Sequence, residues 1–391
     1  MQAGIALDVT PTPLPVDVPA WIRLSGLDAG QEVTLRAEFQ DGSANLWHSE
    51  AVFIADADGV VDLTRQAPSN GSYDHVDPMG LVWSASPAAS QAGVLFFMTS
   101  LTPGPVRITA SVTDRIVATV DVPRTLQRSD IESRAIDAPG VVGWLYRPSG
   151  SRRRPAVVVV GGSDGGLSPF IEHEAALFAT HGYAALALAY FGYAELPPTL
   201  SEIPLEYFGN AIRWLQDQPG IDADRLAVVG YSRGGELALL LGATFPEIKA
   251  VVSYVGSGIV VSSLDGASSA WSLRGEPVPY WTYADAASLD AATITVERIN
   301  GPVLLISGQR DLLWSSFALS ELAMDRLAER EHAFAYEHLA YRDAGHAIAS
   351  PYLPTTPETL ALFGGTAAGS AAASADSWLH VLKMLADRLK P

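Results

Sequence analysis

The first third of the chain shows the alternation of apolar and polar positions that β-strands produce. Residues 32–39 are the clearest case, because Val33, Leu35, Ala37 and Phe39 would all lie on one face. Shorter apolar runs of strand type occur at 20–24, 51–54, 95–98 and 106–112. Turn-forming residues separate these runs, and no helical periodicity of useful length interrupts them. The pattern predicts an antiparallel, immunoglobulin-like β-sandwich of about seven strands over residues 1–125.

The pattern changes across residues 126–150, which we interpret as a linker with the first strands of a second domain. Within residues 151–391, fully apolar runs alternate with glycine-rich turns and stretches of helical spacing. Strands buried on both faces are predicted at 155–160, 184–188, 225–229, 250–254, 302–306 and 333–339. Helices are predicted at 172–181, 205–218, 234–243 and 374–389, with a loop of small residues at 367–375. This alternation is typical of βαβ units and predicts an α/β domain with a doubly wound sheet.

One predicted strand–helix junction carries the sequence Gly-Tyr-Ser-Arg-Gly at residues 230–234. A Gly-x-Ser-x-Gly match alone is weak, but here a buried strand precedes it and a helix follows. The two glycines allow a tight turn that would expose the hydroxyl of Ser232 above the sheet. The backbone N–H of Arg233 would then lie at a helix N-terminus, where it can stabilise an oxyanion. We therefore predict Ser232 as a nucleophile for acyl transfer.

A serine nucleophile needs a base, and the base needs an acid that holds its tautomer. Of the eight histidines, His346 follows the last predicted strand in a short turn, Asp-Ala-Gly-His. Asp311 follows the strand predicted at 302–306, so the chain order is Ser, Asp, His, as in α/β-hydrolases. Asp343, Asp285 and Asp290 are the alternative acids.

The loop after the first buried strand of the second domain reads Gly-Gly-Ser-Asp-Gly-Gly at residues 161–166. Its glycines let the backbone approach a substrate closely, so the N–H of Ser163 or Asp164 would complete the oxyanion hole. Gly162 and Asp164 are predicted to contact substrate. Neither a P-loop nor a dinucleotide-binding pattern is present, and no cluster of metal ligands stands out, so we predict no cofactor and no metal.

Composition narrows the choice of partners. The 391-residue chain carries 43 acidic and 25 basic residues, a net charge of −18, which disfavours a nucleic acid partner. Its apolar runs are far shorter than the ~20 residues of a membrane span, and no targeting segment is visible, which predicts a cytoplasmic location. Arg152, Arg153 and Arg154 form the one dense basic cluster, which we interpret as solvated linker charge. The chain contains no cysteine, so thiol chemistry is excluded.

Longer stretches of sequence resemble the family of acyl-CoA thioesterases and bile acid-CoA:amino acid N-acyltransferases. The stretches that carry the resemblance are 59–63, 71–73 and 78–84 in the first domain, and 165–167, 185–191, 196–197, 205–208 and 230–236 in the second. The resemblance implies a two-domain enzyme that attacks an activated acyl group, often a coenzyme A thioester, with Ser232, Asp311 and His346 as its triad.

The resemblance also bears on the acceptor of the acyl group. Members that conjugate amino acids typically carry cysteine at the nucleophile position, so Ser232 favours hydrolysis. Arg233 stands where many members have lysine. Residues 257–290, rich in Ser, Trp and Tyr, are predicted to lie over the pocket and set substrate choice. Open alternatives are an esterase or lactone hydrolase, transfer to an amine or alcohol, and a non-catalytic binding protein. The sequence does not indicate an oligomeric state.

Overall fold

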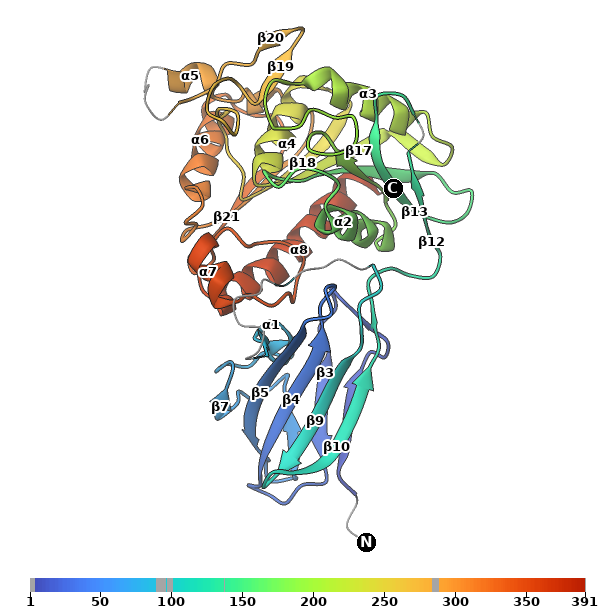
Figure 1. Ribbon diagram of the computed structural model, residues 1–391, viewed down its shortest axis with the longest axis vertical. Coiled ribbons are helices and arrows are strands. Elements are labelled where there is room, and N and C mark those ends of the chain that lie inside the picture. The colour runs from blue at the N-terminus through green and yellow to red at the C-terminus, as the bar shows by residue number, and fades with distance from the viewer. Residues whose placement is uncertain (1–3, 89–95, 97–100, 137, 283–287, 391) are drawn as a thin grey trace.

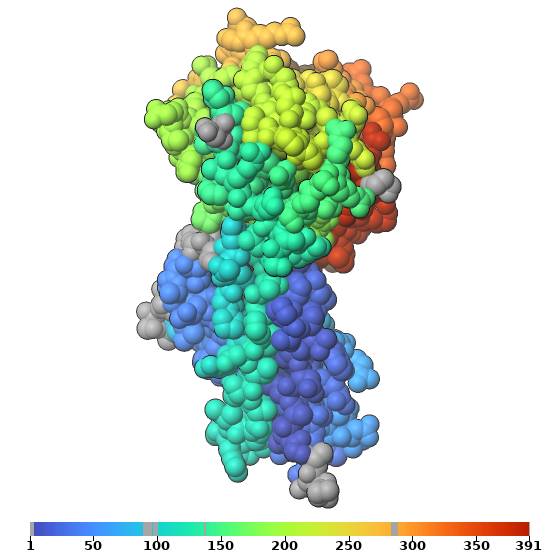
Figure 2. All heavy atoms as spheres, turned by 90° about the vertical axis from the view of Figure 1, so that its right-hand side faces the viewer, coloured from blue at the N-terminus to red at the C-terminus, as the bar shows by residue number. Residues whose placement is uncertain are grey.

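The computed structural model describes residues 4–88, 96, 101–136, 138–282 and 288–390, which form two parts stacked along the long axis of the molecule (Figures 1 and 2). The part nearer the N-terminus is built of antiparallel strands. The other part is a sheet with helices on both faces (Figure 1).

The N-terminal part is the predicted antiparallel sandwich. One sheet has the order β1-β3-β6, with bounds Ala6–Thr10, Trp21–Ser25 and Val60–Asp62. The other has the order β10-β9-β4-β5-β7, with β8 also paired to β5. Its bounds are β4 Glu32–Gln40, β5 Leu46–Ile54, β7 Asn70–Gly71, β8 Ser86–Pro87, β9 Val106–Val112 and β10 Arg115–Val122. The alternation in β4 is confirmed, because its four apolar side chains are all buried in the sandwich core. The strand predicted at 95–98 lies, apart from Phe96, outside the described residues.

The second part holds an eight-stranded sheet of order β12-β13-β15-β14-β17-β18-β21-β22. Its bounds are β12 Ile131–Ala135, β13 Val142–Pro148, β14 Arg154–Val160, β15 Ala184–Ala189, β17 Ile221–Tyr231, β18 Ile248–Tyr254, β21 Val303–Gly308 and β22 Tyr336–Tyr341. The last six of these run parallel, whereas β12 and β13 pair antiparallel at one edge. The fold is the predicted α/β-hydrolase type. The central parallel strands β14, β15, β17, β18 and β21 are mostly apolar and buried because helices cover both faces, whereas the edge strand β22 is half-buried.

Two hydrophobic cores flank this sheet, one on each face. The helices are α2 Pro169–Thr180, α3 Leu205–Gln216, α4 Arg233–Thr244, α5 Leu289–Ala292, α6 Ser316–Glu329, α7 Pro357–Phe363 and α8 Ala367–Leu389, with a short 3-10 helix at Val296–Arg298. Side chains of α3, α4 and α6 pack on one face, and those of α2 and α8 pack on the other. Val158 and Val159 show the division, because these neighbours on β14 point into opposite cores. A small sheet of order β16-β19-β20 (Ile203–Pro204, Trp271–Leu273, Glu276–Pro277) lies outside the main one.

The prediction of a loop at 367–375 is wrong, because α8 begins at Ala367. The hydroxyl of Thr366 accepts the N–H of Gly369 at 3.0 Å and so caps the first turn. The small residues allow close packing on two sides: Ala371 lies in the sandwich core and Ala373 in the core of the second part. Small side chains at the start of α8 therefore pack between the two parts of the molecule.

Two further segments join the parts. Strand β2, Leu14–Pro15, pairs in parallel with β11, Arg124–Thr125, at the point where the chain leaves the sandwich. The short helix α1, Gly80–Trp83, packs against α8. None of the described helices combines the length and the apolar character that a membrane crossing requires.

Candidate active site

The turn between β17 and α4 presents Ser232 in a strained conformation. Its backbone has φ 58° and ψ −121°, which a residue with a side chain rarely adopts. The flanking glycines are required by space: a Cβ on Gly230 would collide with the carbonyl of Gly234, and one on Gly234 would collide with the carbonyls of Val160 and Gly161. This is the sharp strand-to-helix turn that exposes a nucleophile.

The predicted triad residues lie in one hydrogen-bonded row. Nε2 of His346 is 2.9 Å from Oγ of Ser232. Nδ1 of His346 is 2.7 Å from Oδ2 of Asp311. The imidazole is held between two aromatic rings, with Phe363 stacked at 5.7 Å and Trp314 edge-on at 6.3 Å. The structure therefore brings together three residues that are distant in the sequence, each at the end of a strand or in the loop that follows one.

Asp311 is the carboxylate that faces the histidine. Its other oxygen, Oδ1, accepts the N–H groups of Leu313 and Trp314 at 3.0 and 3.2 Å, which fixes the orientation of the carboxylate. Among the alternatives, Asp343 instead pairs with Arg310 at 2.8 Å. Asp290 lies in α5, and Asp285 lies outside the described residues.

The glycine-rich loop 161–166 lies against the serine. Gly162 approaches so closely that a Cβ there would be 3.0 Å from the Cβ of Ser232. Gly162, Ser163 and Asp164 line the same pocket as Ser232. Within the described part of the chain, the N–H groups of Ser163 and Arg233 have no hydrogen-bond partner. Two free N–H groups beside a nucleophile are the arrangement that an oxyanion requires.

The pocket at Ser232 has a volume of about 440 Å³. Apart from the groups named above, its lining is mostly apolar: Phe170, Val255, Leu313, Ala347, Ile348, Ala349 and Phe363. Residues 257–290 were predicted to lie over the pocket, but none of the described residues of that range lines it, and residues 283–287 lie outside the described residues. The segment that follows His346 and Phe363, the last residue of α7, form this part of the pocket wall.

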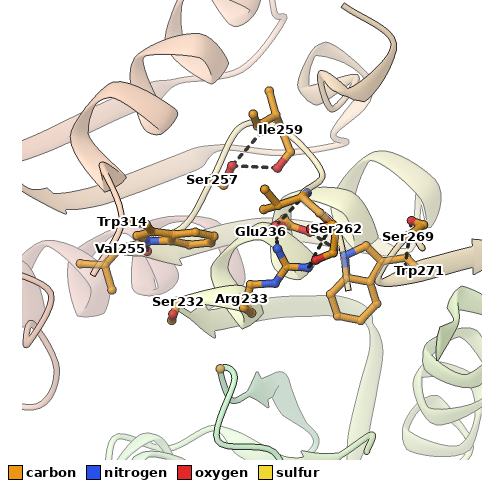
Figure 3. A network of polar contacts seen from close by, with 12 residues as sticks. Ser232, Arg233, Glu236, Val255, Ser257, Ile259, Ser262, Ser269, Trp271 and Trp314 are labelled. Carbon is orange, nitrogen blue, oxygen red and sulfur yellow. Dashed lines mark hydrogen bonds and ion pairs between the residues drawn. The ribbon is translucent and has the colours of Figure 1, made fainter. Parts of the chain in front are cut away.

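A buried network of polar contacts beside Ser232 involves the first part of this segment, residues 257–271 (Figure 3). Arg233 pairs with Glu236 at 2.9 Å and donates to the carbonyls of Val261 and Ser262, both at 3.1 Å. Glu236 also accepts the indole N–H of Trp271 at 2.7 Å. These bonds hold Val261, Ser262 and Trp271 against the first turn of α4.

The same network reaches the triad. The guanidinium of Arg233 lies 6.0 Å from the ring centre of Trp314, the residue that packs edge-on against His346 (Figure 3). Burial raises the pKa of Glu236 to about 7, against the opposing effects of Arg233 and Trp271. The sequence analysis assigned a role only to the backbone of Arg233 and did not identify Trp314. The charged pair Arg233 and Glu236, three residues apart on an otherwise apolar helix, was the feature of the sequence that could have indicated this buried network.

A second buried carboxylate supports the turn from below. Glu174 of α2 accepts the hydroxyl of Tyr231 at 2.6 Å, and the Tyr231 ring stacks on Tyr254 at 4.7 Å. Burial raises the pKa of Glu174 to about 7. No group of three or more metal-ligating side chains is found among the described residues.

The sequence of this chain is similar to those of known proteins over both parts of the molecule. The family described as "Acyl-CoA thioester hydrolase/BAAT N-terminal region" matches residues 17–138, and "BAAT / Acyl-CoA thioester hydrolase C terminal" matches residues 203–268 and 279–391. The chain is 30% identical to acyl-coenzyme A amino acid N-acyltransferase 1 of Mus musculus over 98% of both chains. It is 28% identical to acyl-coenzyme A thioesterase 1 of Homo sapiens over 93% of this chain and 91% of the relative.

A solved structure extends the likeness in fold. A puromycin-hydrolysing peptidase of Mycobacterium tuberculosis matches with a TM-score of 0.50 and 16% identity, covering 99% of this chain and 68% of that one. At that identity the match concerns the fold alone. The sequence matches span both parts of the molecule, including the strained serine turn and the histidine loop. The chain therefore belongs to the family of acyl-CoA thioester hydrolases and bile acid-CoA:amino acid N-acyltransferases (BAAT).

Proposed function

We propose that this protein is an acyl-CoA thioesterase that works through a Ser232–His346–Asp311 triad and an acyl-enzyme. The observation that carries the proposal is the row of hydrogen bonds from Asp311 through His346 to a serine at φ 58°. Both free N–H groups lie beside that serine, so nucleophile, base, acid and oxyanion donors meet at one point.

The first half of the reaction forms the acyl-enzyme. Oγ of Ser232 attacks the thioester carbonyl while Nε2 of His346 takes the hydroxyl proton. The N–H groups of Arg233 and Ser163 stabilise the oxyanion of the tetrahedral intermediate. When the intermediate collapses, the C–S bond breaks and His346 returns the proton to the departing thiolate. Asp311 keeps the imidazole in the correct tautomer and stabilises its charged form.

The second half releases the acid. A water molecule loses a proton to His346 and attacks the acyl-serine, and the proton returns to Oγ of Ser232 as the acid leaves. Water is the proposed acceptor because serine occupies the nucleophile position. Gly162 and Asp164, which line the pocket, would contact the bound thioester.

A second candidate is transfer of the acyl group to an amine. It is favoured by the full-length likeness to an acyl-coenzyme A amino acid N-acyltransferase. An amine nucleophile would replace water in the second half-reaction and would use the same triad, so the geometry alone does not separate the two outcomes.

The test compares substrates and acceptors on the purified protein. We expect a higher kcat/KM for an acyl-CoA than for the nitrophenyl ester of the same acid, and free acid as the product with or without glycine. Mass spectrometry identifies the product, and Ser232→Ala serves as the blank. A strong preference for the nitrophenyl ester would contradict thioesterase activity, and acylglycine as the main product would favour the acyltransferase.

We further propose that residues 1–125 and 151–391 are separate domains joined by 126–150, which contains β12 and β13. The cytoplasmic location stays a prediction.

A further inference from the structure

A hollow lined by basic side chains lies at the edge of the main sheet opposite to Ser232. It has a volume of about 360 Å³ and is formed by the start of β14, the first half of β17 and the residue that follows α8. The sequence alone indicates solvated linker charge for residues 152–154, whereas the structure groups them with two cations that are distant in the chain. We call the basic residues that line the hollow the basic cluster: Arg152, Arg153, Arg154, Arg225 and Lys390.

The register of the sheet shows how far this hollow lies from the active site. Arg154 is the first residue of β14, and Val160, its last residue, pairs with Gly230 beside the nucleophile turn. At about 3.3 Å per residue, the length of β14 separates the two ends by about 20 Å. The hollow is therefore at the amino ends of the parallel strands, whereas Ser232 is at their carboxyl ends.

Most of the charge in the basic cluster is not neutralised by acidic side chains. Among the described residues, its one ion pair joins Arg225 to Asp222 at 2.6 Å, and no acidic residue lines the hollow. His181 also lines it, but Nε2 of that ring is 2.6 Å from Asp17 and is thus engaged elsewhere. Like charges that are gathered in this way repel one another, and a bound anion would offset the repulsion.

Main-chain carbonyls hold two members of the basic cluster in place. Nε of Arg153 donates to the carbonyl of Ile221 at 3.1 Å, and Nζ of Lys390 donates to the carbonyl of His181 at 3.0 Å. The Lys390 ammonium also lies 4.8 Å from the ring centre of Tyr183. Further N–H groups of both side chains remain for a ligand, since a guanidinium has five and an ammonium three. Donors that are fixed before binding lose less conformational entropy when the ligand arrives.

We propose that this hollow binds a small anion whose negative charges are carried by phosphate groups, at a site separate from the active site. Arginine and lysine are the side chains that bind phosphate oxygens, arginine through paired hydrogen bonds. Several cations around one hollow match a multiply charged anion better than a single carboxylate. The inference goes beyond the proposed thioesterase function and does not depend on it.

Shape and net charge favour a small ligand over a macromolecule. The volume of the hollow falls within the range of about 300–1,000 Å³ that small-molecule pockets occupy. The chain as a whole has a net charge of −18, which opposes a long polyanion such as a nucleic acid. A small anion responds mainly to the local field of the basic cluster.

The main test is the binding of inorganic pyrophosphate, measured by isothermal titration calorimetry at constant ionic strength. We expect one site per chain, and a Kd that rises about 10- to 100-fold in Arg152→Gln/Arg153→Gln. The matched control is Arg115→Gln/Arg330→Gln, which removes the same charge from two exposed arginines on other elements and should leave the Kd unchanged. An absence of binding to the wild type, or equal losses in the two variants, overturns the proposal.

The single variant Arg152→Gln keeps the test independent of folding. The Arg152 side chain is exposed, and it forms no hydrogen bond or ion pair with the residues that the structure describes. Its replacement should leave the Tm unchanged and raise the Kd of pyrophosphate by about 3- to 10-fold. A Kd equal to that of the wild type overturns the assignment of the basic cluster.

A second measurement determines whether the basic cluster instead holds the phosphates of coenzyme A in the substrate. The KM of an acyl-CoA should be the same in Arg152→Gln/Arg153→Gln as in the wild type, because the hollow is remote from Ser232. A rise in KM confined to that variant would overturn a separate site. If the wild type hydrolyses no acyl thioester, the proposed function fails, and the pyrophosphate titration still decides this site.

Two further comparisons test the chemistry of the ligand. Citrate should bind more weakly than pyrophosphate, because its charges lie on separate carboxylates, and equal affinity would overturn the assignment to phosphate. Sedimentation should be the same for the wild type and Arg152→Gln/Arg153→Gln. Self-association of the wild type that the variant lacks would make the hollow an interface between copies of the chain and overturn the small ligand.

Discussion

The α/β part contains two rows of serine, histidine and carboxylate with the same connectivity. In the first, Ser232, His346 and Asp311 are joined at 2.9 and 2.7 Å. In the second, Nε2 of His338 is 2.7 Å from Oγ of Ser307, and its Nδ1 is 2.5 Å from Oε1 of Glu321. Hydrogen bonding alone does not distinguish the two rows.

The surroundings of the two rows distinguish them. Ser232 stands on a strained turn, lines a pocket of about 440 Å³ and has free N–H groups beside it. Ser307 lies within β21 and is fully buried between β18 and β22, and Phe317 stacks on His338 at 5.6 Å. A substrate carbonyl can reach the first hydroxyl and has no access to the second. The comparison teaches that a triad requires exposure and oxyanion donors as well as three bonded side chains.

The largest effect is expected from Ser232→Ala. Without the nucleophile, kcat should fall by about 10⁵-fold, as for other serine hydrolases that lose a triad member. Steady-state hydrolysis of an acyl-CoA measures this, with Tm as the control for folding. A variant that keeps most of its activity would contradict the assignment of the first row.

The next effect is expected from Asp311→Asn. The amide can donate a hydrogen bond to Nδ1 and so hold the imidazole in the wrong tautomer, which should lower kcat by roughly 10³- to 10⁴-fold. The kcat of Asp311→Asn and that of the wild type are measured in the same acyl-CoA assay over a range of pH. If activity is retained, another carboxylate orients His346.

Ser307→Ala tests the second row. The change removes the partner of a buried imidazole nitrogen, so the free energy of unfolding should fall by about 1–3 kcal/mol, whereas kcat should stay at the wild-type value. Denaturant unfolding and the acyl-CoA assay give the two values. If Ser307→Ala lost as much activity as Ser232→Ala, the second row would also be needed for catalysis, which would contradict the comparison.

The smallest effect is expected from Glu321→Gln. The side chain is 46% exposed, and glutamine can still accept a hydrogen bond from His338. We expect a change in unfolding free energy within about 0.5 kcal/mol and no change in kcat. If Glu321→Gln lowered kcat as much as Asp311→Asn, Glu321 would be as important for catalysis as Asp311, which would contradict the comparison.

Much of the site could be predicted from local sequence. Gly230 and Gly234 are required by close backbone contacts within the turn itself, so the motif is visible without the rest of the fold. The order of Ser232, Asp311 and His346 could also be read, because the ends of parallel strands meet at one edge of a sheet. Local sequence did not predict that α8 begins before residue 374, and it did not predict that the described residues of 257–290 do not line the pocket. The first depends on packing against the sandwich, and the second on the side chain of Arg233.

By itself, the sequence determined the two kinds of secondary structure, the family and the candidate nucleophile, because these depend on periodicity and on motifs a few residues long. Only the tertiary structure decided which of two serine–histidine–carboxylate rows lines a pocket and which is closed within the sheet. That difference depends on side chains that meet across long separations in the chain, and local pattern carries no information about such contacts.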